Sequence, residues 1–438
     1  MSARMSRQLI DNRRGDRTRV DNYNLLVLDS AFSFQAITSR GLEDSVTCRD
    51  LNGYFSHVWS VHPFASMVSD GEVDATGRAE VHELNERHTF IDGKVGRYDW
   101  LQGLPKLNFL LAQMGLLLQL RRLIRRERIG IIRAPDPLYN GLFALILSRL
   151  AGIPLLVRVG ANHDKTFETT GTPMLPRLFP SRKMEKAVGK FVLARADCVA
   201  GANQDNLDFA IANGARREKS TLFRYGNLID RLHFTDPASR TIDDDWFQTH
   251  AVAPHRFLMF VGRLEPVKHP DDVIRVLAEL VRRGHDLKLL LIGDGRMRAR
   301  LAELAAELGL SGNVVFCGNQ TQEFLASMYP LSAVVLSPHT GRALSEAALA
   351  GARIVAYDVD WQAEMIESGV TGELVRHADW MAMADATEAI LVDPARATRI
   401  GTGVRARARE MMDPDRLNQH ERATYQRLLV DAAAASES

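Results

Sequence analysis

Residues 257–276, FLMFVGRLEPVKHPDDVIRV, set the fold class of this sequence. The apolar run Phe257–Val261 leads without alternation into Gly262, a pattern typical of a parallel strand buried on both faces. Pro270 then opens a helical pattern, since proline fits the first turn of a helix. A buried strand followed at once by a helix indicates a βα unit of a doubly wound α/β sheet.

The same alternation of short apolar runs and helical patterns extends along most of the chain. It predicts an α/β fold with parallel sheets, and helices between the strands. The predicted strands are Leu25–Leu28, Ile129–Arg133, Leu155–Val159, Cys198–Ala200, Thr221–Phe223, Phe257–Val261, Leu287–Ile292, Val314–Phe316, Ala333–Leu336 and Ile354–Tyr357.

The pattern is interrupted between about Asp230 and His255, so we expect two α/β domains joined there, with a cleft between them. For the charged last segment, the pattern leaves open whether it ends the second domain or crosses back onto the first. The expected parts are a disordered arm (1–20), a first domain (21–235), a linker (236–255), a second domain (256–405) and a C-terminal helix with its tail (406–438).

Composition narrows the class of protein. The 438 residues carry 55 Lys and Arg against 54 Asp and Glu, so a net charge of +1 gives no reason to bind nucleic acid. Three widely spaced cysteines do not suggest a disulfide framework, and they favour a cytoplasmic protein. The longest uncharged apolar run, Leu107–Leu120, is too short to span a bilayer.

Cations follow the predicted strand Phe257–Val261. Arg263 and Lys268 lie in the loop between a strand end and a helix start, where an anion such as a diphosphate binds well. Two solvated surface cations are the alternative. The segment His339-Thr340-Gly341 begins a second short helix whose amides could face a phosphate, and Glu346 inside it could accept bonds from ligand hydroxyls or be an exposed helical acid.

Three further segments have two interpretations each. His163 follows the strand Leu155–Val159 and could position a proton near neutral pH, or be structural. Arg121–Arg128 holds five arginines that could contact anionic lipid as a peripheral membrane segment, or form a solvated helix face. Asp358 and Asp360 could hold a divalent metal or serve turn chemistry; we expect no metal site.

These motifs together resemble the family-4 glycosyltransferases, which are retaining enzymes of the GT-B fold. The resemblance extends from about Asn162 to the C-terminus. The matching segments are Gly262-Arg263-Leu264 with Lys268, Gly293-Asp294-Gly295, Val314 to Asn319, Tyr225 to Asp230 with Phe234, Ser345-Glu346-Ala347 to Ala352, and Glu364.

The resemblance implies two facing Rossmann-like domains and a nucleoside-diphosphate sugar as donor, with no cofactor required. It implies that Arg263 and Lys268 neutralise the leaving diphosphate, that Glu346 holds the donor ribose, and that His163 lies near the transferred sugar. It also implies a donor site lined by Gly262, Gly318, Asn319, His339, Thr340, Gly341 and Leu344.

One departure from the family concerns the donor sugar. The family has an acid eight residues before the position of Glu346, and here that residue is Pro338. The sequence therefore predicts a retaining, hexosyltransferase-like enzyme that moves a sugar to a glycan or glycolipid acceptor. The expected role of this enzyme is the synthesis of a surface polysaccharide. The alternatives are another GT-B enzyme, such as a nucleotide-sugar epimerase or phosphorylase, or a scaffold that binds a nucleotide sugar without turnover.

Overall fold

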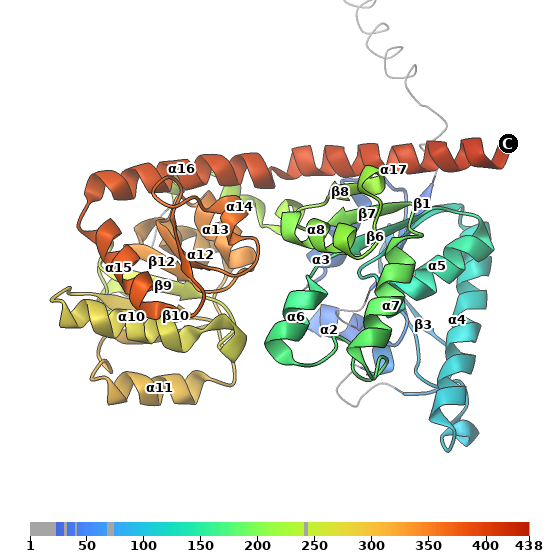
Figure 1. Ribbon diagram of the computed structural model, residues 1–438, viewed down its shortest axis with the longest axis horizontal. Coiled ribbons are helices and arrows are strands. Elements are labelled where there is room, and N and C mark those ends of the chain that lie inside the picture. The colour runs from blue at the N-terminus through green and yellow to red at the C-terminus, as the bar shows by residue number, and fades with distance from the viewer. Residues whose placement is uncertain (1–22, 30–32, 40–41, 68–73, 241–243, 438) are drawn as a thin grey trace, which may run out of the picture. The chain divides into compact units, whose positions relative to one another are not determined.

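The computed structural model describes residues 23–29, 33–39, 42–67, 74–240 and 244–437 (Figure 1). The arm expected over residues 1–20 lies outside these residues. The chain divides into two compact units. Unit 1 comprises the residues up to Arg224 together with those from Asp415 onward, and unit 2 comprises Tyr225–Pro414.

Unit 1 is built on an eight-stranded sheet with the order β3-β4-β2-β1-β5-β6-β7-β8. Its neighbouring strands are parallel, except that β3 runs antiparallel to β4. The strands are β1 (Asn24–Leu28), β2 (Val58–His62), β3 (Glu80–Asn85), β4 (His88–Asp92), β5 (Ile129–Ala134), β6 (Leu155–Val159), β7 (Cys198–Gly201) and β8 (Ser220–Leu222). The helices are α2 (Phe34–Ser39), α3 (Asp44–Thr47), α4 (Pro105–Arg126), α5 (Tyr139–Ala151), α6 (His163–Thr170), α7 (Arg182–Leu193), α8 (Gln204–Ala212) and α17 (Pro414–Glu437).

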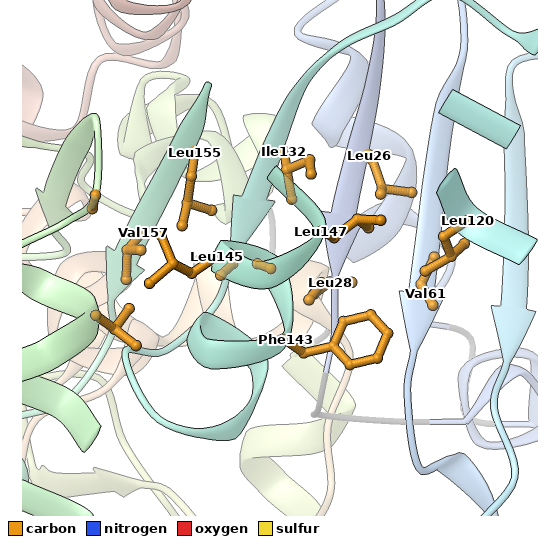
Figure 2. Packing of buried hydrophobic residues seen from close by; sticks show 14 of the residues in the cluster. Leu26, Leu28, Val61, Leu120, Ile132, Phe143, Leu145, Leu147, Leu155 and Val157 are labelled. Carbon is orange, nitrogen blue, oxygen red and sulfur yellow. The ribbon is translucent and has the colours of Figure 1, made fainter. Parts of the chain in front are cut away.

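Both faces of this sheet are covered, which is why its central strands are continuous apolar runs. On one face, Leu26, Ile132 and Val157 pack against Leu120 of α4 and Phe143 of α5 (Figure 2). The opposite face has its own cluster, formed by Leu25, Val27, Leu51, Phe55, Val58, Ile131, Leu156, Cys198, Ala200, Phe223, Tyr425, Leu428 and Leu429.

The last helix belongs to unit 1, which decides between the two arrangements that the sequence left open. Pro414 starts α17, and the buried residues Tyr425, Leu428 and Leu429 join the second apolar cluster of unit 1. The ring of Tyr425 meets that of Phe55 edge to face at 5.2 Å. The apolar stripe of α17 therefore completes the core of the first domain.

Unit 2 is built on a six-stranded, fully parallel sheet with the order β11-β10-β9-β12-β13-β14. The strands are β9 (Phe257–Val261), β10 (Lys288–Ile292), β11 (Val314–Gly318), β12 (Val334–Ser337), β13 (Ile354–Asp358) and β14 (Glu373–Arg376). The helices are α9 (Asp244–His250), α10 (Pro270–Arg282), α11 (Arg298–Glu307), α12 (Gln322–Met328), α13 (Arg342–Leu349), α14 (Gln362–Met365), α15 (Trp380–Leu391) and α16 (Pro394–Met412).

Alternate residues of each strand enter different core clusters. Met259 of β9 packs in a cluster with α12, α13 and α16, whereas Leu258 and Phe260 pack in a cluster with α10, α11 and α15. The fold expected from the sequence is confirmed: two α/β domains of the GT-B type, each built on a mainly parallel sheet.

The expected linker over residues 236–255 is wrong. That stretch contains α9, and Phe247 and Val252 are buried in the same cluster as Phe257. The chain enters unit 2 at Tyr225, earlier than the expected first-domain end at residue 235, since Ile229 already lies in that cluster. The polar composition of this stretch hid two apolar side chains that anchor it to the second core.

All ten predicted strands are present, and β2, β3, β4 and β14 were missed. Among these, β3 and β14 carry several polar or half-exposed side chains, so their runs are not continuously apolar. Within the described ranges, no helix combines the length and the hydropathy needed to cross a lipid bilayer.

Candidate functional site

The carboxyl ends of neighbouring strands meet at one edge of the unit 2 sheet, where ligands bind in open α/β folds. Two backbone hydrogen bonds tie these ends together. The N–H of Gly262 donates to the carbonyl of Ile292 at 2.9 Å, and the N–H of Gly293 donates to the carbonyl of Gly318 at 2.8 Å. The turns after β9, β10 and β11 therefore lie side by side.

The glycines of the second turn are required by this close approach. A Cβ on Gly293 would lie 2.0 Å from the carbonyl oxygen of Gly262, and the φ of Gly293 is +128°. A Cβ on Gly295 would lie 2.5 Å from the carbonyl oxygen of Leu264. The segment Gly293-Asp294-Gly295 is thus a strand-to-helix turn that fits against the turn after β9.

Lys268 reaches from the turn after β9 to the turn after β12. Its Nζ donates to the carbonyl of Thr340 at 2.6 Å and lies 3.1 Å from Nδ1 of His339. Burial, assisted by the charge of Arg263, lowers the pKa of Lys268 to about 8, while Asp360 opposes this shift. Lys268 is therefore not a solvated surface cation, whereas Arg263 is exposed.

The start of α13 lies beside that lysine. Gly341 is the N-cap residue, and a Cβ on it would lie 3.9 Å from Nζ of Lys268. The hydroxyl of Thr340 donates to Oδ2 of Asp360 at 3.0 Å. Since the first turn of a helix has unpaired N–H groups, this position combines a cation with backbone donors and suits a phosphate group.

His339 contributes a neutral imidazole to this site. Burial and the charge of Lys268 together lower its pKa to about 4. His269 and His377 act in the same direction from the side of α10 and β14. An imidazole that is neutral at physiological pH can hydrogen-bond a ligand without adding repulsion to the lysine.

Glu346 is not an exposed helical acid. It is 4% exposed in the core-facing side of α13, and the hydroxyl of Tyr329 donates to its Oε2 at 3.4 Å. Burial raises the pKa of Glu346, and the neighbouring His233 and Arg342 oppose that shift.

The other predicted residues of unit 2 differ in exposure. Gly318 ends β11 with a φ of +64°, and Asn319 beside it is exposed. The side chain of Leu344 is buried in the cluster of α12, α13 and α16. Its expected contact with the donor stays a prediction.

His163 lies in unit 1, at the start of α6. Its side chain is 5% exposed and packs against the ring of Phe209 at 5.4 Å. Burial lowers its pKa to about 4, although Glu185 opposes the shift. The imidazole is therefore neutral at physiological pH and can give or accept a hydrogen bond. The expected role of His163 near the transferred sugar stays a prediction.

Sequence reasoning missed two histidines near Lys268, and it considered Asp360 only as a possible metal ligand or turn residue. His269 follows it directly, and its Nε2 lies 3.0 Å from Nε2 of His377, which follows the missed strand β14. Asp360 holds Thr340 and acts on Lys268. Only His269 had a sequence signal, its place beside Lys268 at a helix start. Within the described residues, no three His, Cys, Asp or Glu side chains gather as a metal site would require.

Two family models match most of the chain. The model described as Glycosyl transferase 4-like domain matches residues 70–226, and the one described as Glycosyl transferases group 1 matches residues 242–407. The first match lies in unit 1 and the second in unit 2, so the residues of the candidate site around Lys268 belong to the second.

Curated relatives match over part of their length. The D-inositol 3-phosphate glycosyltransferase of Nocardia farcinica is 35% identical over 215 residues, which are 44% of this chain and 47% of that protein. The alpha-D-kanosaminyltransferase of Streptomyces kanamyceticus is 26% identical over 261 residues, 58% of this chain and 65% of that protein. The chain thus spans about half to two thirds of these relatives.

Solved structures share the fold over nearly the whole chain. HepE of Anabaena in complex with UDP and glucose has a TM-score of 0.65 at 18% identity, and covers 92% of this chain and 99% of its own. The sucrose-phosphate synthase of Thermosynechococcus elongatus has a TM-score of 0.68 at 18% identity, and covers 93% of this chain and 100% of its own.

Proposed function

The chain belongs to the family of GT-B glycosyltransferases that these models describe, and from that premise we propose that it is a retaining sugar transferase. In the proposed reaction, the bond from the anomeric carbon of a nucleoside-diphosphate sugar to the diphosphate oxygen breaks. The diphosphate leaves with the electron pair, and an acceptor hydroxyl bonds to that carbon and passes its proton to the departing diphosphate oxygen. The observation that carries the proposal is Lys268 held at the start of α13.

This arrangement suits the charge that develops in such a reaction. Negative charge grows on the diphosphate as it leaves, and fixed donors aimed at it lower the barrier. Lys268 is mostly protonated at neutral pH, since its pKa of about 8 lies above 7. Together with Arg263 and the first amides of α13, it would neutralise the diphosphate without a divalent metal.

The remaining residues would bind the rest of the donor. Glu346 would accept hydrogen bonds from the ribose hydroxyls, and Gly318 with Asn319 would lie against the base. His339 and Thr340 would contact the sugar, where the family has an acid and this chain has Pro338. Their neutral donors would replace a carboxylate, so we expect a different choice of donor sugar.

We propose a glycan or glycolipid as acceptor, in the synthesis of a surface polysaccharide. His163, neutral at physiological pH, would hydrogen-bond the transferred sugar or the acceptor. Inositol 3-phosphate, which the name of one relative mentions, is the competing acceptor for an assay. Transfer of labelled sugar to an extracted glycolipid fraction, but not to inositol 3-phosphate, would support the first class.

The donor site is tested by thermal shift with UDP, GDP, ADP, TDP and their sugar conjugates, with and without magnesium. A ligand at 100 times its dissociation constant stabilises the protein by about 2.7 kcal/mol, so the bound nucleotide raises Tm. We expect one nucleotide to do so in wild type and in the surface control Arg217→Ala, and none in Arg263→Ala. An unchanged shift in Arg263→Ala would show that the diphosphate binds elsewhere.

A binding scaffold without turnover is the second candidate, favoured by Pro338 in place of the acid. Slow hydrolysis of the bound donor by pure protein separates the two. A transferase should slowly hydrolyse the donor when no acceptor is present, and the Arg263→Ala variant should not. A scaffold binds the nucleotide sugar with the same thermal shift and leaves it intact.

A further inference from the structure

The outer face of α4 in unit 1 is apolar. Leu107, Leu110, Met114 and Leu118 are between 44% and 57% exposed. Their spacing of three, four and four residues places them within an arc of about 80° on the helix, at about 100° per residue. They form a continuous stripe, named here the α4 stripe.

The α4 stripe is not the side that packs on the sheet. The opposite side of α4 buries Leu116, Leu120 and Ile124 in the core of unit 1. Figure 2 shows Leu120 in this core. A surface helix normally pairs such a buried side with a polar outer one, and a helix that is apolar all round is normally covered on both sides. The α4 stripe is therefore a surface that another apolar phase would cover.

More apolar side chains are exposed just before the helix. Trp100 is 78% exposed, and Tyr98 and Leu104 are also exposed. The rings of Tyr98 and Trp100 lie 5.6 Å apart. Tryptophan and tyrosine are the residues that gather where protein meets the headgroups of a bilayer.

Arginines continue the same face beyond the apolar stripe. Arg122 and Arg125 are exposed and follow Leu118 by one and two helical turns. From Pro105 to Arg126, the helix has the cations Lys106, Arg121, Arg122, Arg125 and Arg126 and no acid. Its surface charge thus has one sign.

We propose that the α4 stripe and its arginines lie in the headgroup layer of an anionic bilayer, which holds unit 1 at the membrane surface. Apolar side chains enter the boundary of the acyl chains, while arginines meet lipid phosphates from the same helix face. The proposal concerns a surface of unit 1 and does not depend on the donor chemistry of unit 2.

A second copy of this chain fits the surface less well. A symmetric dimer pairs the same surface from both copies. It would bring two sets of arginines to one interface with no acid of α4 to pair them. A bilayer that contains anionic lipid supplies both the apolar phase and the opposite charge.

The test is flotation of the full chain with vesicles of phosphatidylcholine alone, or with one third phosphatidylglycerol. We expect binding to the anionic vesicles. Two double variants should each lower the partition coefficient at least tenfold: Leu110→Ser with Met114→Ser, and Arg122→Gln with Arg125→Gln. The first removes apolar side chains from the boundary of the acyl chains. The second removes two cations, each of which contributes about a fivefold effect near the surface. Since all four side chains are exposed, the variants should keep the wild-type Tm.

Two control variants test whether vesicle binding depends on this face of α4 or on any exposed apolar or cationic side chain. Val392→Ser removes an exposed apolar residue of unit 2, and Arg216→Gln with Arg217→Gln removes exposed cations of unit 1. Both should bind as wild type does. Equal flotation of all variants, or no flotation of wild type, would overturn the proposal. So would a wild-type dimer in solution that Leu110→Ser with Met114→Ser converts to monomers without any change in flotation.

Discussion

Lys268 is a partly buried cation whose charge changes close to physiological pH. Its surroundings lower its pKa to about 8, since burial and the charge of Arg263 disfavour the ammonium form. Its hydrogen bond to the carbonyl of Thr340 holds it at the start of α13. At the residue scale, we therefore expect the strength of anion binding to depend on whether Lys268 is protonated.

The affinity for a nucleoside diphosphate should fall as pH rises through 8. Lys268 is charged below its pKa and neutral above it, so Kd should increase about tenfold between pH 7 and pH 9. The diphosphate itself is fully charged over this range, because its last pKa is near 6. Isothermal titration at pH 7, 8 and 9 measures this, and Lys268→Arg should give a flat profile. A flat wild-type profile would remove Lys268 from the site.

Glu346 should recognise the ribose hydroxyls. In wild type, the best nucleoside diphosphate should bind more tightly than its 2′,3′-dideoxy analogue by about 1.5–3 kcal/mol, the usual worth of hydrogen bonds to a charged group. Glu346→Gln should lose most of that difference. Tyr329 can still donate to the amide oxygen, so Tm should change little. Glu323→Gln, an exposed acid on α12, is the control and should keep full discrimination.

At the scale of elements, the turns that follow the strands of unit 2 are positioned by backbone contact. The turns after β9 and β10 approach so closely that Gly293 has no room for a side chain, and its φ of +128° disfavours one. Another glycine of unit 2, Gly312 before β11, has open space around its Cβ position and no such φ. Gly293 is therefore required by its backbone conformation and its close contact, whereas Gly312 is not.

Gly293→Ala should destabilise unit 2 by about 1–3 kcal/mol from the backbone conformation alone, with more from the clash. Displacement of Gly262 should also weaken nucleotide binding. Gly312→Ala should change stability by no more than about 0.5 kcal/mol. Chemical unfolding and nucleotide titration of both variants measure these effects. Equal stability and equal nucleotide affinity of the two variants would show that the turns after β9 and β10 can move apart without loss.

At the scale of the whole molecule, the chain leaves unit 1 at Arg224 and returns to it at Asp415. Unit 1 is completed by α17, whose Tyr425 fills a core with Phe55 and Phe223. The guanidinium of Arg133 donates to the hydroxyl of Tyr425 at 3.3 Å. Unit 2 has its own core, so the two units depend on different side chains.

Tyr425→Ala should destabilise unit 1 by about 3–5 kcal/mol, as loss of a large buried aromatic ring does. Tyr425→Phe should cost about 1–2 kcal/mol through the lost hydrogen bond, and the exposed Val430→Ala less than about 0.5 kcal/mol. Hydrogen exchange should quicken in β1, β5 and β7 and stay unchanged in β9, β10 and β12. Nucleotide affinity should also be unchanged; if it falls with Tyr425→Ala, the two units are coupled.

The sequence by itself determined the fold class, because strands covered on both faces are continuous apolar runs that can be read locally. It also located the turn that carries Arg263 and Lys268, and the helix that carries Glu346. It missed β3 and β14, whose side chains are partly exposed, and it mistook residues 236–255 for a linker.

Tertiary structure decided what depends on neighbours distant in sequence. Burial made His163 and His339 neutral, put Leu344 into the core, and brought His269, His377 and Asp360 around Lys268. It also assigned α17 to unit 1 and left an apolar stripe on the outside of α4. A pKa and a solvent-exposed face depend on which distant residues pack nearby, and periodicity along the chain does not record that.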